Sequence, residues 1–305
     1  MPQFRPYTSN DLREVLQFIG KCFLDDRFSH YHPGDILHWM SSEHKGRDLD
    51  KHFWLYKVHN ELVAFAELPK ATWAQYTLII DSNRCESSLE LELLAECQRV
   101  MFERMEQNPP DERVLSTHVA ATDRQRLDHL ANLGYKLKPS KRVLTLQSLN
   151  RLLPTPGLPD GFHLRSVASE AEADLVADVH NGSFGNNWTG AEYLEVMRTP
   201  GFAIERELVV VAPDGRFAAF LIYWLDQVSK TGLFEPVGCH KDFQRRGLTK
   251  ALMYEAMKRM IAAGMTRAIV EHYNDNEAAA KLYNSVGFKE HFGTFDCEIH
   301  VGGEK

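Results

Sequence analysis

The sequence predicts an α/β protein with mixed sheets, organised as two similar halves joined by a linker. Short apolar segments rich in β-branched residues alternate along the chain with longer segments of helical apolar spacing. Residues 150–160 contain three prolines and one glycine, a composition that the interior of a helix or strand does not accommodate. We therefore divide the 305 residues into a first half, 1–149, a linker, 150–160, and a second half, 161–305.

Both halves are expected to open with a strand followed by a helix. In the first half the strand is expected at 4–8 and the helix at 9–22. In the second half the strand is expected at 162–167 and the helix at 169–179. This shared opening is the first sign that the two halves repeat one design.

Later elements recur at a nearly constant distance along the chain. The hairpin segment 60–65 corresponds to 215–220, an offset of 155 residues. Gly134-Tyr135 corresponds to Gly287-Phe288, an offset of 153 residues. A steady offset over separate elements indicates a duplicated unit.

Residues 238–252 contain a short basic loop. This loop follows an apolar segment, 232–237, that is expected to be a strand, and it leads into helical spacing that continues to Gly264. The first backbone N–H groups of such a helix have no partner inside the helix, and they attract anions. Gly247 lets a ligand approach the backbone closely. Positive charge is added by Arg245, Arg246 and Lys250. We expect a ligand that carries a pyrophosphate.

Two motifs resemble the signatures of the GCN5-related N-acetyltransferases (the GNAT family). The first, residues 244–249, reads Gln-Arg-Arg-Gly-Leu-Thr and resembles the acetyl-CoA loop Gln/Arg-x-x-Gly-x-Gly/Ala, although Thr249 departs from the usual last residue. The second, residues 274–288, starts 30 residues later, after an expected strand at 266–273. It combines an asparagine, an alanine-rich helix, Leu-Tyr and Gly-Phe. The joint match implies two tandem GNAT folds, an architecture similar to that of mycothiol synthase.

The resemblance implies that acetyl-CoA binds at the basic loop and along the strand before it. In this family the pantetheine arm lies beside that strand, and an asparagine both caps the following helix and contacts the arm. A backbone N–H of the strand would face the thioester oxygen. The residues expected to bind acetyl-CoA are Val237, Gly238, Cys239, Gln244, Arg245, Arg246, Gly247, Leu248, Thr249, Lys250 and Asn276.

Acetyl transfer to an amine needs a proton acceptor. A lysine-like ammonium has a pKa near 10.4, so the neutral amine lies about 4.6 kcal/mol uphill at pH 7, and a positioned base lowers that cost. Glu235, just before the cofactor-binding residues, is the first candidate for the base or the amine anchor, ahead of Glu271 and Asp226. Alternatively, Glu235 is a solvated carboxylate and a chain of waters carries the proton, as also occurs in this family.

Tyr283 is the candidate proton donor to the departing thiolate. It follows Asn276 by seven residues, or about two helical turns, so both side chains project from one side of the helix. The alternative is a core aromatic residue. Cys239 lies next to the expected thioester, but we expect no nucleophilic role, because the family transfers the acyl group directly.

The first half does not repeat these residues. At the offset of 153, Asn276 corresponds to Asp123 and Tyr283 to Leu130. After the expected strand at 76–80, residues 81–88 contain no glycine and two acids, which would repel a pyrophosphate. We expect a first half that binds no acetyl-CoA and that braces the second half or lends a wall to its substrate cleft.

Composition limits the class of protein. A net charge of −7 argues against a nucleic-acid binder. The five cysteines have no C-x-x-C spacing, and the histidines, including His30, His32 and His38, have no acidic or cysteine partner at ligand spacing, so no metal is expected. The sequence has no signal peptide and no membrane-span run, which predicts a cytoplasmic protein that contacts no membrane. We expect a monomer or a homodimer.

The resemblance predicts an acetyl-CoA-dependent N-acetyltransferase that acts on a primary amine of a small molecule, by direct transfer in a ternary complex. The alternatives are a protein or peptide acceptor, or a non-catalytic acyl-CoA-binding or scaffold protein. The loop expected at 181–190 follows the first helix of the second half, where family members shape the acceptor site. Its aromatic residues, with Tyr223 and Trp224, line a cleft or belong to the core.

Overall fold

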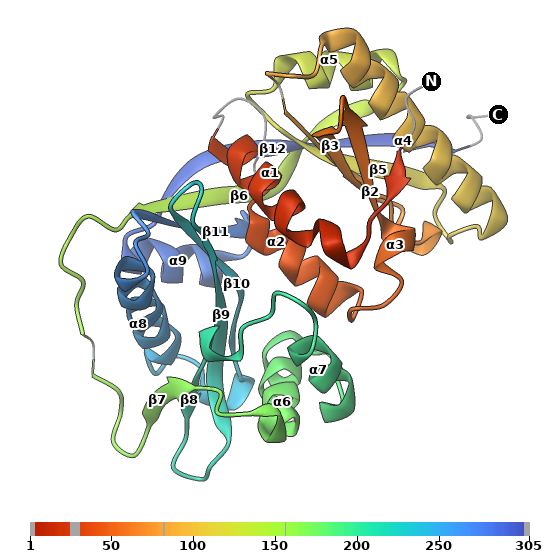
Figure 1. Ribbon diagram of the computed structural model, residues 1–305. Coiled ribbons are helices and arrows are strands. Elements are labelled where there is room, and N and C mark those ends of the chain that lie inside the picture. Colours follow the sequence, from red (N-terminus) through yellow and green to blue (C-terminus); the bar gives the residue numbers. More distant parts are fainter. Residues whose placement is uncertain (1–3, 25–30, 82, 156, 302–305) are drawn as a thin grey trace. The chain divides into compact units, whose positions relative to one another are not determined.

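The computed structural model describes residues 4–24, 31–81, 83–155 and 157–301 (Figure 1). The chain forms two compact units, and neither unit is one continuous stretch. The first unit comprises 1–32, 48–143 and 292–305, and the second comprises 33–47 and 144–291. The units therefore differ from the sequential halves, because each takes in residues from the other half. His30, named among the histidines above, lies outside the described residues.

The first unit contains a four-stranded antiparallel sheet in the order β1-β2-β3-β4. Its strands are β1 (Arg5–Pro6), β2 (Phe53–Val58), β3 (Glu61–Glu67) and β4 (Thr77–Ile80). Its helices are α1 (Leu12–Leu24), α3 (Leu49–His52), α4 (Ser87–Gln107) and α5 (Arg124–Asn132), with short 3-10 turns at Ser9–Asp11 and Ala71–Trp73. One apolar stripe of α4 packs into the core of this unit, through Leu93, Leu94, Cys97, Met101 and Met105.

Two long strands, β6 (Lys136–Ser148) and β12 (Lys289–His300), contribute residues to both units. In the first unit, the end of β12 pairs antiparallel with β5 (Val114–Ala120), from Thr294 opposite Ala120 to His300 opposite Val114. In the second unit, the end of β6 lies beside β11 (Arg267–Tyr273), where the Thr145 hydroxyl donates a hydrogen bond to the Val270 carbonyl at 2.8 Å. The last strand segment of each half thus completes the unit of the other half.

The second unit is built on a mixed sheet in the order β6-β11-β10-β9-β8-β7. The pairs β7–β8, β8–β9 and β9–β10 are antiparallel, and β10–β11 is parallel. The remaining strands are β7 (His163–Ser166), β8 (Glu207–Val211), β9 (Phe217–Asp226) and β10 (Thr231–Cys239). The helices are α2 (Pro33–His38), α6 (Ala173–Phe184), α7 (Gly190–Met197), α8 (Leu248–Ala262) and α9 (Glu277–Val286).

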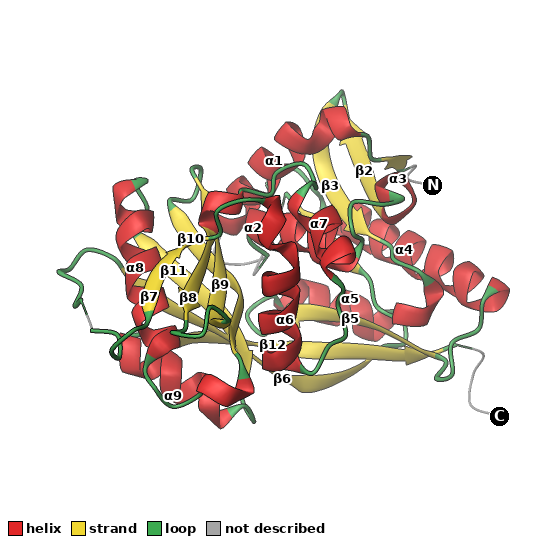
Figure 2. Ribbon diagram, turned by 90° about the horizontal axis from the view of Figure 1, so that it is seen from below, coloured by secondary structure: helices red, strands yellow, loops and turns green. Residues whose placement is uncertain are grey.

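Helices cover both faces of this sheet (Figures 1 and 2). Leu208 and Val210 of β8 join the core under α8, whereas Val209 and Val211 join the core under α6 and α7. This alternation is the two-residue period of a strand, with apolar side chains on both faces. It explains why these strands read as continuous apolar runs.

Residues 33–47, from the first half of the sequence, belong to the second unit. Helix α2 packs against β9 and β10, and Ile36 is fully buried. Leu37 fills the space beside Gly201, where an added Cβ would lie 2.4 Å from its Cδ2. Lys45 forms an ion pair with Glu192 of α7 at 2.6 Å. Most of the stabilisation comes from the apolar contacts, because exposed ion pairs contribute little.

The expected loop at 181–190 is wrong over its first four residues and at Gly190, where α7 begins. Helix α6 continues to Phe184 and ends where Gly185 adopts a left-handed φ of +74°. The Asn181 side chain then holds the following turn, since it accepts a hydrogen bond from Trp188 N and donates one to Trp188 O. Within the described residues, no helix has the length and apolarity needed to cross a membrane.

Candidate active site

The basic loop ends in a left-handed turn that starts α8. Arg245 has φ +63° and Gly247, at the N-cap of α8, has φ +76°. A side chain in this region costs roughly 1–2 kcal/mol, which explains the glycine. A Cβ on Gly247 would have no heavy atom within 4 Å. The space beside Gly247 is therefore open at the N-terminus of α8, where backbone N–H groups attract anions.

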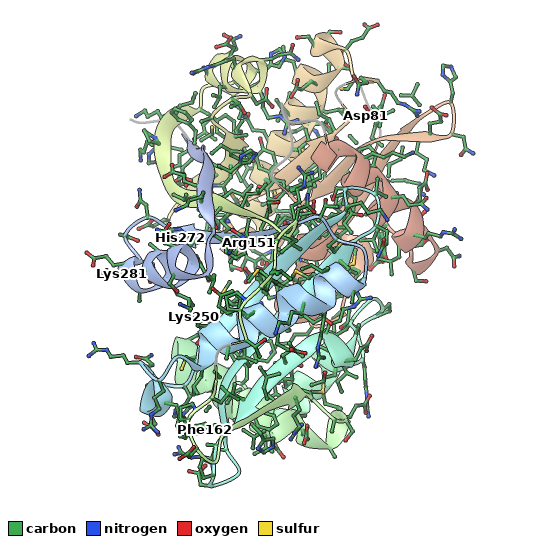
Figure 3. All side chains as sticks on the ribbon, turned by 90° about the vertical axis from the view of Figure 1, so that its left-hand side faces the viewer. Asp81, Arg151, Phe162, Lys250, His272 and Lys281 are labelled. Carbon is green, nitrogen blue, oxygen red and sulfur yellow. The ribbon has the colours of Figure 1, made fainter. Side chains whose placement is uncertain are left out.

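Cationic side chains surround this turn. Arg245 and Arg246 are exposed, and the Arg246 guanidinium lies over the ring of Phe243 at 5.5 Å. Lys250 lies on the first turn of α8, and α9 packs against α8 (Figure 3). Gln244 is held by a long hydrogen bond, 3.5 Å, from its side-chain amide to the Cys239 carbonyl.

Strand β10 separates from β11 where the cofactor arm is expected. The parallel pairing runs from Thr231 opposite Arg267 to Leu233 opposite Ile269, and both strands continue beyond it. On the β9 side, the register shifts by one residue between Phe234 and Val237. A β-bulge of this kind bends the strand and redirects its polar groups. The edge of β10 at 237–239 can therefore accept an added extended ligand.

Packing within the protein explains why residue 238 is glycine and why the Cys239 thiol is buried. A Cβ on Gly238 would lie 2.3 Å from the Phe220 ring, so only glycine fits. Burial raises the pKa of the Cys239 thiol, and the nearby Thr249 hydroxyl opposes this only in part. The thiol is neutral at pH 7, which counts against a nucleophilic role. The Thr249 side chain, which departs from the family pattern, thus interacts with the Cys239 thiol.

Asn276 and Tyr283 lie on α9 as the spacing predicts. The Asn276 side chain caps the helix by accepting a hydrogen bond from Ala279 N at 3.1 Å. Tyr283 is buried, with its ring 5.6 Å from the His272 ring and 6.3 Å from the Phe288 ring. Burial raises the pKa of its hydroxyl strongly, and the charge of Glu235 adds to the rise. Tyr283 is therefore a protonated phenol close to Glu235.

Glu235 lies at the bulge of β10 and faces a histidine from the first half of the sequence. Trp224 donates its indole N–H to the Glu235 carbonyl at 2.7 Å. The carboxylate Oε1 lies 3.8 Å from Nε2 of His38, and 36% of the Glu235 side chain is exposed. Burial lowers the pKa of His38 to about 4, with a further contribution from His180. His38 is therefore neutral near pH 7 and forms no ion pair with Glu235.

The structure thus brings together Glu235, Tyr283 and His38. The motifs in the sequence identified the first two but missed His38. No pattern around residue 38 marks it, because the histidine reaches Glu235 only through the packing of α2 against β10. Its neighbours Ile36 and Leu37 are apolar and buried, which signals a packed helix and no chemistry.

An aromatic cluster lies on the α6 side of the sheet. His180, whose pKa burial lowers to about 4, contacts the rings of Phe184, Trp188, Tyr193 and Phe220. Phe184 is 47% exposed, and Lys45 lies 4.7 Å above the Trp188 ring. Tyr223 and Trp224, in contrast, are buried core residues.

Of the two weaker base candidates, Asp226 lies away from Glu235, whereas Glu271 lies on the neighbouring strand at the same level of the register. Asp226 is buried and closes the turn after β9, where it accepts hydrogen bonds from Val228 N and Ser229 N. It sits opposite Thr231, at the start of β10, and Glu235 lies further along that strand. Glu271 lies on β11, two residues past Ile269, the last residue of β11 that pairs with β10. Among the described residues, no group of three or more His, Cys, Asp or Glu side chains is arranged to hold a metal ion.

The first unit uses the equivalent position for its own packing. Leu78 of β4 pairs with Ala66, and Val237 of β10 pairs with Leu221, which lies 155 residues after Ala66. Leu78 is therefore the counterpart of Val237. Its carbonyl accepts a hydrogen bond from Arg126 of α5 at 2.9 Å. The residue 153 positions after Arg126 is Ala279, which has no polar side chain.

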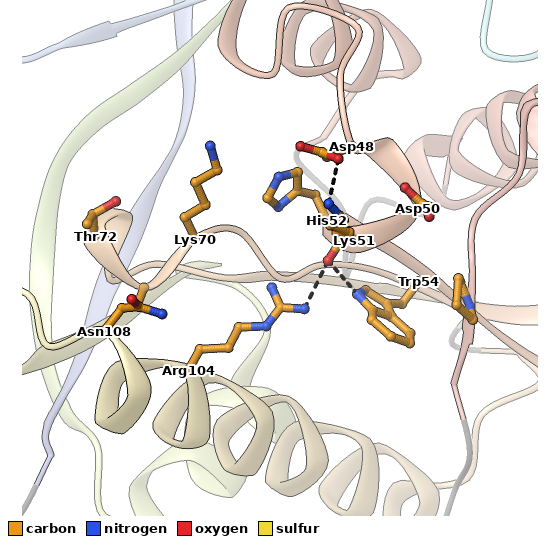
Figure 4. A pocket seen from close by; sticks show the side chains of 11 residues that line it. Asp48, Asp50, Lys51, His52, Trp54, Lys70, Thr72, Arg104 and Asn108 are labelled. Atoms are coloured by element: carbon orange, nitrogen blue, oxygen red, sulfur yellow. Dashed lines mark hydrogen bonds and ion pairs between the residues drawn. The ribbon is translucent and has the colours of Figure 1, made fainter.

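A separate cavity of about 730 Å³ lies in the first unit (Figure 4). Its walls come from the region of α3, β2 and the end of α4, and none from the loop at 81–88. Arg104 donates to the carbonyls of Lys51, Leu68 and Pro69, and Lys51 pairs with Asp48 at 2.7 Å. These cations are thus engaged by the protein itself, and the cavity is no counterpart of the α8 site.

Comparison with known proteins supports the resemblance to the GNAT family that the two sequence motifs indicate. The model of the acetyltransferase (GNAT) family matches residues 174–288. These residues belong to the GNAT family. A mycothiol acetyltransferase of Paenarthrobacter aurescens (strain TC1) is 26% identical over 156 residues, which cover 48% of each protein, so the match spans about half the length of this relative.

Solved structures share the tandem GNAT fold over the whole chain. A GCN5-related N-acetyltransferase from Sphaerobacter thermophilus has a TM-score of 0.68 and 16% identity, and the match covers 99% of this chain and 96% of that one. A tandem GNAT protein from the clavulanic acid biosynthesis pathway has a TM-score of 0.68 and 14% identity, with full coverage of both chains. The mixed α/β fold and its tandem GNAT arrangement are thereby established.

Proposed function

We propose that this GNAT protein is an acetyl-CoA-dependent N-acetyltransferase that acetylates a primary amine of a small molecule by direct transfer in a ternary complex. One observation carries the proposal. A single unit combines the open N-terminus of α8, the edge of β10 that separates from β11, and the group formed by Glu235 and Tyr283.

Cofactor binding would use the first two features. The N–H groups at the start of α8, with Arg245, Arg246 and Lys250 nearby, would hold the pyrophosphate. The backbone of Val237, Gly238 and Cys239 would bond the pantetheine arm as an added strand. A backbone N–H of this segment would stabilise the oxyanion of the tetrahedral intermediate.

The chemistry would use the side chains. The Glu235 carboxylate is partly exposed, so it would take a proton from the amine and release it to solvent. Tyr283 keeps its proton, because burial and the charge of Glu235 both oppose the phenolate. A protonated phenol beside the thioester would supply the proton that the thiolate needs.

Two measurements test the proposal on the full chain. Calorimetry with acetyl-CoA should give one site per chain. Release of free CoA should then be measured with glucosamine, spermidine, lysine and a short peptide with a free N-terminus as acceptors. If at least one of the first three is turned over faster than the peptide, the acceptor is a small molecule. Faster turnover of the peptide supports a protein or peptide acceptor. Binding of acetyl-CoA without turnover of any amine would support the alternative of a non-catalytic acyl-CoA-binding or scaffold protein.

The Tyr283→Phe variant separates an enzyme from such a scaffold. It removes only the hydroxyl, and we expect kcat to fall by about 10²-fold while acetyl-CoA affinity stays the same. The matched control is Tyr254→Phe, a buried tyrosine of α8 in the same unit that should keep the wild-type kcat. Unchanged turnover in Tyr283→Phe would remove the hydroxyl from the mechanism.

A further inference from the structure

The acylation of an ammonium removes two protons from one nitrogen. The first must leave before the nitrogen can attack the thioester carbon. Once the N–C bond has formed, the nitrogen is positively charged again and must lose a second proton as the C–S bond breaks. One proton ends on the sulfur and the other in solvent. A site with a single carboxylate can hold only one of these protons at a time, so a second acceptor at the same place would assist the reaction.

His38 lies where such an acceptor is needed. It is the last residue of α2, and its Nε2 is 3.8 Å from Oε1 of Glu235. This separation is too long for a direct hydrogen bond. One nitrogen placed between the two atoms could reach both at hydrogen-bond distance. The pair is therefore spaced to share a donor such as a substrate amine.

The imidazole is buried with unused capacity for hydrogen bonds. Only 14% of the side chain is exposed, and within the described residues its Nδ1 has no hydrogen-bond partner. An unsatisfied buried polar atom destabilises the folded protein, so its presence needs an explanation. Glu235 faces the ring from β10, and His180 acts on it from α6. Burial keeps the ring neutral, which leaves one ring nitrogen able to accept a proton.

We propose that His38 is the second proton acceptor for the substrate amine, an inference that rests on the proposed function. The Glu235 carboxylate takes the first proton from the ammonium. After the N–C bond forms, Nε2 of His38 takes the second, the electron pair of the C–S bond moves to sulfur, and the Tyr283 hydroxyl protonates the thiolate.

The charges balance at the end of the transfer. The amide and free CoA have formed, Glu235 is a neutral acid, His38 is an imidazolium and Tyr283 is a phenolate. The His38 proton then returns the phenolate to a phenol through intervening water, and Glu235 loses its proton to solvent through its exposed face. No oxidant, reductant or metal is required.

Chemical rescue tests this role with the best acceptor from the panel above. His38→Ala and His38→Gln should both lower kcat by about 10²-fold, the loss expected for a general base, while acetyl-CoA affinity stays the same. Added imidazole should restore the turnover of His38→Ala in a saturable way, by about tenfold or more. It should not restore His38→Gln, because the glutamine side chain fills the space.

His44→Ala is the matched control. His44 is a buried histidine of the segment 33–47, which also contains His38. This variant should keep the wild-type kcat, and added imidazole should not change its turnover. A wild-type kcat in His38→Gln would overturn the proposal. So would a loss in His38→Ala that imidazole does not relieve, since that loss would reflect packing. If the wild type acetylates no amine, the proposed function fails first, and that outcome is distinct from an active wild type whose His38 variants keep its kcat.

Discussion

The two units place different residues at one equivalent position. The first unit uses this position for its own packing, and the second leaves it open. In the first unit, Asp123 caps α5 and Arg126 reaches the carbonyl of Leu78 and the carboxylate of Glu90 at 2.8 Å, with all of these side chains buried. The second unit keeps only the cap. Asn276 is exposed there, and Ala279 leaves the carbonyl of Val237 without a competing guanidinium from α9.

Under the proposed function, in which only the second unit binds acetyl-CoA, this comparison indicates how a cofactor site can be lost without losing the fold. The helix cap and the strand register persist, because they stabilise the backbone whether or not a ligand binds. In the first unit, the guanidinium of the buried Arg126–Glu90 ion pair also donates a hydrogen bond to the strand carbonyl of Leu78. The predictions below test this contrast, from the largest expected effect to the smallest.

Gly247→Glu should abolish acetyl-CoA binding in calorimetry. The change puts a side chain at φ +76° and a negative charge where the pyrophosphate is expected. The counterpart Ser87→Glu, at the start of α4, should leave binding intact. Loss of binding in Ser87→Glu would place the site in the first unit. Binding that survives in Gly247→Glu would show that the site is not at the start of α8.

Arg126→Leu should destabilise the first unit by about 3–5 kcal/mol, because it leaves the buried Glu90 and Asp123 carboxylates without their cation. Urea unfolding measures this loss. Arg99→Leu, which breaks an exposed ion pair on α4, is the control and should cost less than about 1 kcal/mol. Equal losses of unfolding free energy in the two variants would show that the buried network stabilises the unit no more than exposed ion pairs do.

Acid should destabilise the second unit through two neutral histidines. Burial lowers the pKa of His38 and of His180 to about 4, from 6.5 in the unfolded chain. Their contribution is complete above pH 6.5 and is lost as the pH falls towards 4, by up to about 3 kcal/mol for each histidine. Urea midpoints measured across this range should fall less steeply in His180→Gln than in the wild type. Parallel curves would contradict this origin of the acid sensitivity.

Ala279→Arg transfers the feature of the first unit to the second. The new guanidinium should compete for the Val237 carbonyl and weaken acetyl-CoA binding by about tenfold to a hundredfold, the worth of one or two hydrogen bonds. Ala280→Arg, one residue along α9, is the control. If both variants bind normally, the Val237 carbonyl takes no part in binding.

The sequence predicted local features well. The basic loop, the strands around it, the helix that Asn276 caps and the position of Tyr283 on that helix all follow from short-range chemistry such as turn conformation and periodicity. Even the correspondence of Asp123 with Asn276 could be obtained from an offset. The fold class and its tandem GNAT arrangement were predicted correctly from the resemblance of two motifs to the family signatures and from the steady offset between the halves.

Features that depend on tertiary packing were not predictable. His38 meets Glu235 only because α2 joins the unit formed mainly by the other half. Tyr223 and Trp224 were left between cleft and core, since an aromatic residue on a strand fits both until the helices above it are placed. The reason for Gly238, a close approach to Phe220, is likewise visible only in three dimensions.

The exchange of segments has a consequence for biosynthesis. The first unit needs residues 294–300 of β12 to pair with β5, and these residues leave the ribosome after the whole second unit. The usual order, in which an N-terminal domain folds while the rest is still being made, is therefore closed to this chain. Its first unit must wait, with the edge of β5 uncovered, until the residues of the second unit have been made.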